Sequence, residues 1–263
     1  VAREDVQHEK QIRVLGLGGD KQLRRRGARN FGIRIERAGE KGHALAEPGV
    51  GDASRSGRRC GAHGDMGCFS FHPRKVVTCG EGGMVTTSDP DLVDRLRILR
   101  NHGSRRTGTR SVSFVEPGFN YRLGEVAAVM GLAQVRRLGS ILADRRTTAS
   151  HYDATLEGVL GLTVPRPASG TKWSYQSYVV VLDDGIDRDG IISAMADVGI
   201  ETTIGTYACH QHPAYAPWGY RDGDLPNSAR FARQALTLPL IPRMSTAQVE
   251  RVVGALVTAL DSG

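Results

Sequence analysis

A lysine at the end of an apolar run is the first candidate for chemistry in this sequence. Residues 66–71 (MGCFSF) predict a buried strand, and Lys75 follows after Pro73, which has no N–H to donate to a strand ladder. An amine that is held against apolar neighbours loses the solvation that favours its ammonium form, and it then becomes a nucleophile. The alternative is an ordinary surface lysine, because charged side chains are mostly exposed. The motifs around Lys75 decide between these interpretations.

Six short motifs around and beyond Lys75 occur in a fixed order. They are GDMGCFSFHPRK at 64–75, GEGG at 80–83, LRNHG at 99–103, GFNYR at 118–122, GTY at 205–207 and LPL at 238–240. In this order they resemble the DegT/StrS-like family of pyridoxal-phosphate-dependent sugar aminotransferases. The resemblance runs from about Gly57 to the C-terminus. It implies an α/β protein with an incomplete fold-type-I aminotransferase fold, in which the remainder of a large mixed-sheet domain precedes a small C-terminal α/β domain.

The resemblance also implies roles for individual residues. Lys75 would be the catalytic lysine that holds pyridoxal 5′-phosphate (PLP), and the Ser70 hydroxyl would lie near the cofactor phosphate. Asn120 would reach the cofactor phosphate of the neighbouring subunit, which implies a homodimer with shared active sites. Without the resemblance, an asparagine just before a helix is most often an N-cap. Arg122 would contact substrate, and His72 would be either an orienting residue or a packed histidine.

The front of the chain lacks other parts that the resemblance implies. Family members carry a glycine-rich phosphate turn, an aromatic residue that stacks on the pyridine ring and an acidic partner of the ring nitrogen, all upstream of the lysine. Asp52 is the nearest acidic candidate, although Gly51 stands where a glutamate is usual and the spacing to Lys75 is short. With few large apolar side chains, residues 1–57 are expected to be a non-matching, poorly ordered segment. Our hypothesis is that this segment is the same gene read in another frame.

Two further stretches are candidates for substrate contacts. Tyr207 and His210 lie in a loop between positions 205 and 223 that is rich in aromatic and histidine side chains. This loop either packs on its own domain or, by the resemblance, lies beside a sugar nucleotide. A metal site is not expected there, because His210-x-His212 has no nearby acid until Asp222. The arginine-rich stretch 104–116 predicts a solvated loop, which by the resemblance would lie near the substrate entrance.

The remaining pattern predicts a chain of alternating helices and strands. Asp89-Pro90 predicts a helix start by N-cap and N1 preference, and the β-branched run 84–87 predicts a strand. We expect residues 58–140 to be the C-terminal part of the PLP-binding large domain and residues 141–263 to be a small C-terminal α/β domain. The elements expected from position 123 onward are helices at 123–138, 141–156, 187–198, 228–236 and 247–260 and strands at 159–164, 178–182 and 201–204.

Composition limits the functional classes. The share of hydrophobic residues is 40% and that of charged residues 24%, as in ordinary soluble proteins. The net charge of +7 belongs to the front, since residues 1–60 hold 14 Lys and Arg against 8 Asp and Glu while the rest holds 21 against 20. With Phe31 as the only aromatic in that front, nucleic-acid binding is not expected.

No apolar run approaches the ~18 residues of a membrane span, and no signal peptide is recognisable, so we expect a cytoplasmic protein without a membrane partner. The four cysteines lack paired spacing and predict free thiols.

The function implied by the resemblance is a two-stage transamination. An amino group would move from glutamate or glutamine, through PLP, to a keto sugar carried on a nucleotide, and the freed Lys75 amine would move the proton. Without an acidic partner for the ring nitrogen, activity is expected to be impaired. The alternative is a catalytically inactive remnant of a truncated or frame-disrupted aminotransferase. Absorbance changes on addition of PLP would separate the two.

Overall fold

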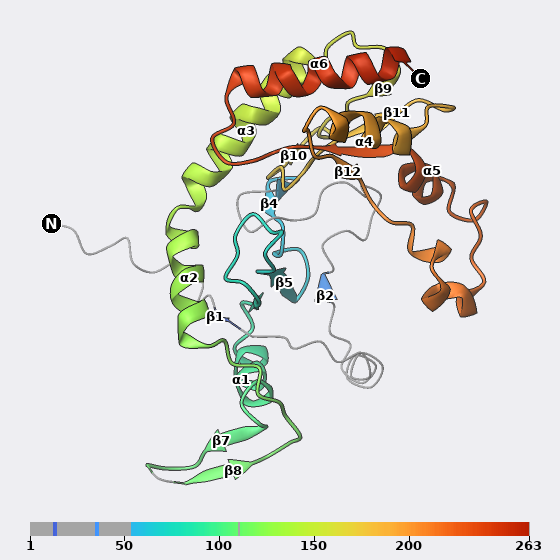
Figure 1. Ribbon diagram of the computed structural model, residues 1–263. Coiled ribbons are helices and arrows are strands. Elements are labelled where there is room, and N and C mark those ends of the chain that lie inside the picture. The colour runs from blue at the N-terminus through green and yellow to red at the C-terminus, as the bar shows by residue number, and fades with distance from the viewer. Residues whose placement is uncertain (1–12, 15–34, 37–53, 110, 263) are drawn as a thin grey trace, which may run out of the picture. The chain divides into compact units, whose positions relative to one another are not determined.

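The computed structural model describes residues 13–14, 35–36, 54–109 and 111–262 (Figure 1). The expectations for Asp52 and for most of residues 1–57 therefore lie outside the described residues. The chain divides into two compact units. Unit 1 contains residues 54–139 and 170–172 together with the strands at 13–14 and 35–36, and unit 2 contains residues 140–169 and 173–262.

A four-stranded mixed sheet is the centre of unit 1. The sheet order is β1 (Arg13–Val14), β6 (Gly83–Thr86), β5 (Met66–Ser70) and β2 (Ile35–Glu36). Strand β5 pairs antiparallel with β6, with Cys68 opposite Val85, whereas β2 pairs parallel with β5. Because β5 and β6 are neighbours, the two ends of the connection formed by residues 71–82 are held next to each other.

Helix α1 (Pro90–Leu99) begins as the sequence predicted. The Asp89 carboxylate accepts hydrogen bonds from the backbone N–H groups of residues 91 and 92, at 2.8 Å and 3.3 Å. Leucines at positions 92 and 96 pack on Met66 and Val85 of the sheet. The amphipathic helix therefore covers β5 and β6.

Helix α2 (Glu125–Arg136) packs one face against the 71–82 connection. Phe71, Val77 and Cys79 are buried there in a cluster that includes Ala127 and Val135 of the helix. The connection that carries Lys75 is therefore anchored by apolar contacts at both of its ends.

Short strand pairs complete unit 1. An antiparallel hairpin joins β7 (Ser104–Arg106) to β8 (Val112–Phe114), where we expected an irregular solvated loop. Each of these strands is only three residues long, too short for an alternating pattern to be read from the sequence. A second small sheet has the order β10 (Thr171–Lys172), β3 (Ser54–Arg55) and β4 (Arg58–Arg59).

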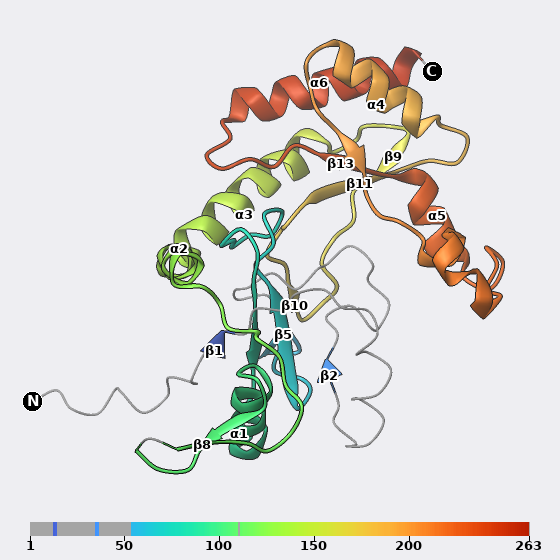
Figure 2. The same cartoon turned by 60° about the horizontal axis from the view of Figure 1, so that its bottom comes forward.

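Unit 2 is an antiparallel sheet covered by helices (Figure 2). The sheet order is β12 (Thr203–Ile204), β13 (Ala235–Leu238), β11 (Tyr178–Leu182) and β9 (Leu162–Thr163). Its helices are α3 (Leu138–Thr155), α4 (Arg188–Asp197), α5 (Pro226–Gln234) and α6 (Thr246–Ser262). Figure 2 shows α4 and α6 side by side over the sheet, and the core between the layers includes the fully buried Tyr152, Leu182, Met195, Leu236 and Leu256.

One expected helix of unit 2 is present but ends earlier than expected, and the strand that follows it was not expected. The helix expected at 228–236 ends at Gln234, and residues 235–238 form β13, a central strand of the sheet. Ala235, Leu236 and Leu238 are all buried, since this strand lies between β11 and β12. Strand pairing with distant residues overrides the local helical pattern.

No single helix among the described residues is long and apolar enough to cross a bilayer. Helices α2 and α3 taken together have that length and composition, but the chain bends between them.

Candidate active site

Lys75 lies in the 71–82 connection between β5 and β6, in a turn closed by backbone hydrogen bonds. The Lys75 N–H donates to the His72 carbonyl (2.9 Å), and the Phe71 N–H donates to the Gly82 carbonyl (2.9 Å). Lys75 is half-buried, and the two valines that follow it are buried. The half-buried lysine is therefore carried by a turn whose backbone is fixed by hydrogen bonds.

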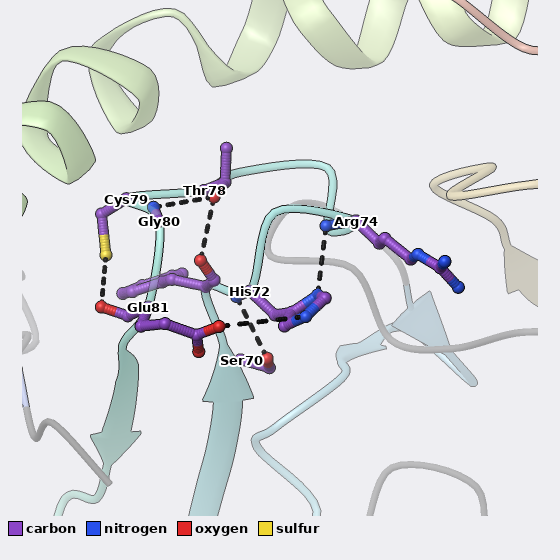
Figure 3. A network of polar contacts seen from close by, with 8 residues as sticks. Ser70, His72, Arg74, Thr78, Cys79, Gly80 and Glu81 are labelled. Atoms are coloured by element: carbon purple, nitrogen blue, oxygen red, sulfur yellow. Dashed lines mark hydrogen bonds and ion pairs between the residues drawn. The ribbon is translucent and has the colours of Figure 1, made fainter. Parts of the chain in front are cut away.

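The return of the connection toward β6 is fixed by Thr78 and Cys79 (Figure 3). The Thr78 hydroxyl donates to the Phe71 carbonyl (3.0 Å) and accepts from the Gly80 N–H (3.0 Å). The Cys79 thiol donates to the Glu81 carbonyl at 3.6 Å. Burial raises the pKa of the Cys79 thiol, and the Glu81 carboxylate adds to this, so the sulfur remains a protonated donor. The four cysteines are free, as predicted.

His72 orders the turn around Lys75 through its imidazole (Figure 3). The Arg74 N–H donates to Nδ1 of His72 (3.2 Å), so in the neutral ring the proton is on Nε2. That Nε2 lies 4.0 Å from the Glu81 carboxylate. The His72 side chain is 48% exposed, so of the two interpretations of this residue the structure favours an orienting residue over a packed one.

Ser70 is the last residue of β5 and belongs to the same network. Its Oγ accepts a hydrogen bond from the His72 N–H at 3.3 Å. A hydroxyl that accepts through a lone pair still has its O–H to donate. Ser70 and Lys75 therefore present a hydroxyl donor and an amine at the two ends of one turn.

The motifs LRNHG and GFNYR are held together by the backbone. The Phe119 N–H donates to the Leu99 carbonyl (2.8 Å), the Tyr121 N–H donates to the Arg100 carbonyl (2.9 Å), and the His102 N–H donates to the Phe119 carbonyl (2.9 Å). The segment that carries Asn120 therefore lies against the end of α1. The sequence did not predict this placement, because the two motifs are separated by residues 104–117.

Asn120 does not cap a helix. Helix α2 begins at Glu125 with Gly124 as its N-cap, and no side chain caps it. The exposed Asn120 side chain instead accepts a hydrogen bond at Oδ1 from Nε of Arg122 (2.9 Å). The interpretation of Asn120 as an N-cap is therefore wrong, and its amide remains available for another role.

Tyr207 and His210 differ in their exposure within unit 2. Tyr207 is 69% exposed, and its ring packs edge-on against His212. The His210 side chain is 4% exposed, and its Nε2 lies 2.9 Å from the Asp222 carboxylate. Tyr207 is thus open to solvent, whereas the buried His210 side chain is bonded within the loop.

Asp222 stabilises the loop 205–223 through side-chain hydrogen bonds. Its carboxylate accepts from the side chains of Gln211 (2.9 Å) and His210 (2.9 Å) and also from Arg233 of α5 (3.3 Å). The hydrogen bonds from Gln211 and His210 lower the pKa of the Asp222 carboxyl. Because the pKa is lowered in the folded state, the stabilisation that the ionised carboxylate contributes is fully present above the ordinary aspartate pKa. It is lost as the pH falls through the lowered pKa.

Removal of this carboxylate is expected to loosen the loop. In the variant Asp222→Ala, chymotryptic cleavage after Tyr215 and Trp218 should be several-fold faster than in the unchanged protein, because the loop loses three acceptor contacts. The variant Glu201→Ala removes an exposed acid outside the loop and should cleave at the original rate. Equal rates for both variants would show that Asp222 does not order the loop.

Comparison with known proteins gives the class of this chain. Residues 46–257 match the DegT/DnrJ/EryC1/StrS aminotransferase family. The chain therefore belongs to that family, and the predicted membership is confirmed, with a match that starts somewhat before the expected Gly57.

Individual relatives are sugar-biosynthesis proteins. The chain is 33% identical over 247 residues to the dTDP-3-amino-3,4,6-trideoxy-alpha-D-glucose transaminase of Streptomyces venezuelae. The aligned region covers 93% of this chain and 61% of that protein. It is 31% identical over 212 residues to the spore coat polysaccharide biosynthesis protein SpsC of Bacillus subtilis (strain 168), with coverage of 76% and 54%. The chain spans about half the length of the curated relatives it matches.

Solved structures show the same fold. The aminotransferase TlmJ from Streptoalloteichus hindustanus superposes with a TM-score of 0.71 at 34% identity, over 80% of this chain and 56% of that chain. The predicted fold type I, present in part, is confirmed. The putative sugar aminotransferase Spr1654 from Streptococcus pneumoniae shares the fold with a TM-score of 0.73 at 24% identity in its PLP form, over 83% of this chain and 57% of that chain. PLP is the cofactor of the family.

The residues of the 71–82 connection fit this cofactor. The half-buried Lys75 supplies an amine of the kind that binds an aldehyde carbon, and the Ser70 hydroxyl is a donor of the kind that binds a phosphate oxygen. Both residues were predicted from the sequence as site residues, whereas His102, which lies 3.5 Å from Arg122, was not. His102 was part of a quoted motif, yet nothing in the local pattern indicated that contact.

Proposed function

We propose that this chain is part of a PLP-dependent aminotransferase that acts on a nucleotide-linked keto sugar, with glutamate or glutamine as amino donor. The observation that carries the proposal is the fixed 71–82 connection, which presents Lys75 and Ser70 at the end of β5 within the region that matches the family. The dTDP-sugar transaminase of S. venezuelae, similar over 93% of this chain, supports a nucleotide sugar as the substrate. The proposal includes a cytoplasmic location, as expected from the sequence.

The proposed roles follow the chemistry of each side chain. When bound, PLP supplies the electron sink for the amino-group transfer. Lys75 would hold the cofactor and then move a proton between the substrate carbon and the cofactor carbon, and His72 keeps the turn that carries Lys75 in place. The proposed ligand contacts are Ser70 and Asn120 at the cofactor phosphate, Asp52 at the ring nitrogen, and Tyr207 and Arg122 at the substrate. His210, which was expected to contact the substrate, is only 4% exposed and would act indirectly, by holding the loop that carries Tyr207.

The proposal also assigns a domain to each part of the chain. Residues 58–140 would be the C-terminal part of the PLP-binding large domain, which the mixed sheet of unit 1 supports. Residues 141–263 would be the small C-terminal α/β domain, which the antiparallel sheet and helices of unit 2 support. Within residues 1–57, the strands β1 and β2 would belong to the mixed sheet, and Asp52 is the proposed ligand contact.

A homodimer with shared active sites is supported by the outer face of α2. Val126 is 77% exposed, Val129 66% and Met130 49%, and these three side chains share one helix stripe at i, i+3 and i+4. Contiguous exposed apolar side chains on a helix mark an interaction surface. The opposite face of α2 is already used against the 71–82 connection. A second copy of the chain is the proposed occupant of the free face.

A charge on this face is expected to separate the subunits. In the variant Val129→Asp, light scattering at micromolar concentration should give a monomer where the unchanged protein gives a dimer, because a carboxylate buried without a partner costs several kcal/mol. The variant Leu160→Asp alters a leucine that is 88% exposed in unit 2 and should leave the dimer intact. A monomer in the unchanged protein would contradict the proposed homodimer.

The proposed activity of this chain is impaired, because Asp52 matches the acidic partner of the ring nitrogen poorly: Gly51 stands where a glutamate is usual, and the spacing to Lys75 is short. Losing ~4 kcal/mol of stabilisation would slow proton transfer roughly a thousandfold. The alternative, an inactive remnant, predicts no absorbance band beyond that of free PLP when the cofactor is added. The proposed function predicts an absorbance band that depends on the lysine and slow conversion to the pyridoxamine form by glutamate. The measurement is PLP titration followed by a glutamate chase.

A further inference from the structure

His72 occupies the first position of the β-turn that carries Lys75. The turn has Pro73 at its second position and is closed by the hydrogen bond from the Lys75 N–H to the His72 carbonyl (2.9 Å). Asparagine, aspartate and serine are preferred at the first position of such turns, because their side-chain oxygens accept from the N–H two residues further on. In this turn Nδ1 of His72 accepts from the Arg74 N–H (3.2 Å). The imidazole therefore takes the place of the usual side-chain oxygen.

A ring nitrogen at this place makes the turn sensitive to protons. The amide oxygen of an asparagine does not titrate and always has lone pairs to accept with. A neutral imidazole accepts at one nitrogen only, and an imidazolium ion has two donors and no acceptor. The hydrogen bond from the Arg74 N–H to His72 is therefore possible only while the ring is neutral with its proton on Nε2. Protonation of Nδ1 would place two N–H donors against each other.

The ring of His72 is open to solvent and has one carboxylate opposite it. The His72 side chain is 48% exposed, so water can deliver a proton to the imidazole. From the opposite limb of the connection the Glu81 carboxylate faces Nε2 at 4.0 Å, but its side chain is 83% exposed and a surface pair of this kind contributes little (Figure 3). The hydrogen bond at Nδ1, rather than the pair at Nε2, is thus the contact that holds the turn.

The other groups around the ring are cations of the same turn and apolar side chains. Arg74 and Lys75 are the cations, and in Figure 3 the Arg74 side chain extends away from the imidazole. Helix α2 packs Ala127 and Val135 against the connection, and neither of these side chains titrates. A change of charge on His72 therefore acts on the turn chiefly through the Arg74 N–H.

We propose that His72 is a positioning residue that couples the placement of Lys75 to pH: the turn keeps its second hydrogen bond while the imidazole is neutral and loses it when the imidazole is protonated. Histidine side chains generally change charge between about pH 5 and 8, a range in which asparagine at this position would not respond. The contact is present at the upper end of that range and is lost as the pH falls. The inference deepens the proposed function and rests on it for the role of Lys75 toward PLP.

The first test follows the Arg74 amide by NMR in the full chain without PLP. Its protection against hydrogen exchange, corrected for the intrinsic pH dependence of exchange, should fall about two- to tenfold between about pH 8 and pH 5.5, because one hydrogen bond is lost. His72→Asn should keep the protection at both pH values, and His72→Phe, whose ring has no acceptor, should lack it at both. Unchanged protection in His72→Phe, or an equal fall with pH in His72→Asn, overturns the inference.

The control for the other ring nitrogen is Glu81→Gln. This substitution alters the group that faces Nε2 of His72 and leaves the contact at Nδ1 in place. The protection of the Arg74 amide at the upper pH should therefore equal that of the unchanged protein. A loss as large as that in His72→Phe would show that Glu81, and not the acceptor at Nδ1, holds the turn, and would overturn the assignment.

The second test carries the effect to Lys75 through the affinity for PLP. The cofactor phosphate and the lysine amine titrate themselves, so the unchanged protein and His72→Asn are compared at each pH. The ratio of their dissociation constants should be near one at about pH 8, and at about pH 5.5 the His72→Asn protein should bind PLP about two- to tenfold more tightly. A ratio that stays constant over this range overturns the coupling between His72 and Lys75.

The two readouts distinguish this inference from the proposed function. The Arg74 amide reports on the turn whether or not the chain holds PLP. If no lysine-dependent absorbance appears with PLP but the protection falls with pH in the unchanged protein and not in His72→Asn, the proposed function fails and the proton-sensitive turn stands. If the absorbance appears and the protection does not respond to pH, the inference fails and the proposed function stands.

Discussion

Replacement of Lys75 by alanine is expected to abolish the visible absorbance band that PLP produces and to slow half-transamination with glutamate by at least about a thousandfold. General acid–base catalysis alone contributes ~10²–10⁴-fold, and the lysine also supplies the nucleophile that attaches the cofactor. Alanine offers neither group. The fold should persist, because the backbone hydrogen bond from residue 75 to the His72 carbonyl is independent of the side chain. The melting temperature is therefore expected to stay close to that of the unchanged protein.

The control for Lys75 is its neighbour in the same turn. Arg74 is exposed, and its contact with His72 comes from the backbone N–H, which alanine retains. Arg74→Ala should therefore leave the absorbance band in place and reduce the rate only slightly. A Lys75→Ala protein that keeps both the band and the rate, or an Arg74→Ala protein that loses both, would show that the catalytic amine has been assigned to the wrong residue.

Local sequence signals predicted the parts of the fold that local physics determines. The start of α1 follows from Asp89 and Pro90, since a cap requires only residues two and three positions ahead. Helix α4 was expected with Ile191, Ile192 and Met195 on its inner side; Ile191 and Met195 are buried, and Ile192 is half-buried against the same core. Strand β11 was expected as a continuous apolar run and lies between two other strands. In each case the pattern extends over enough residues to decide between helix and strand.

The rest depends on partners that are distant in the sequence. Residues 235 and 236 continue a helical pattern, yet β11 and β12 pair with them and draw them into the sheet. Lys75 and Ser70 could be found because they belong to one contiguous motif. The contact between Arg122 and His102 could not, because it joins two motifs that meet only after α1 and the hairpin have folded. The positive φ at His102 has only a weak signal in its residue type, because histidine is enriched at positive φ but adopts it uncommonly.

The close approach of the motifs LRNHG and GFNYR depends on the absence of a side chain at Gly103. Of the glycine-to-alanine substitutions in the described residues, Gly103→Ala is expected to destabilise the protein most. A Cβ at this position would lie 1.6 Å from the Glu116 carbonyl oxygen, a backbone atom, and the residue has a φ of +71°. The N–H of Gly103 is bonded to the Ile98 carbonyl, and its own carbonyl accepts from Val115. The backbone cannot move away without breaking these bonds.

We expect Gly103→Ala to lower the free energy of unfolding by at least about 3 kcal/mol, the sum of left-handed strain and disrupted hydrogen bonds. In a chain of this size that corresponds to a fall in melting temperature of roughly 10 °C. The matched control is Gly80→Ala, since Gly80 has a φ of +83° but no atom within 4 Å of an added Cβ. It isolates the backbone strain and should cost only about 1–2 kcal/mol. Urea and thermal unfolding of the three proteins measure the difference. Equal losses in the two variants would show that the clash with Glu116 is relieved without cost, and that the segment carrying Asn120 is not held by this contact.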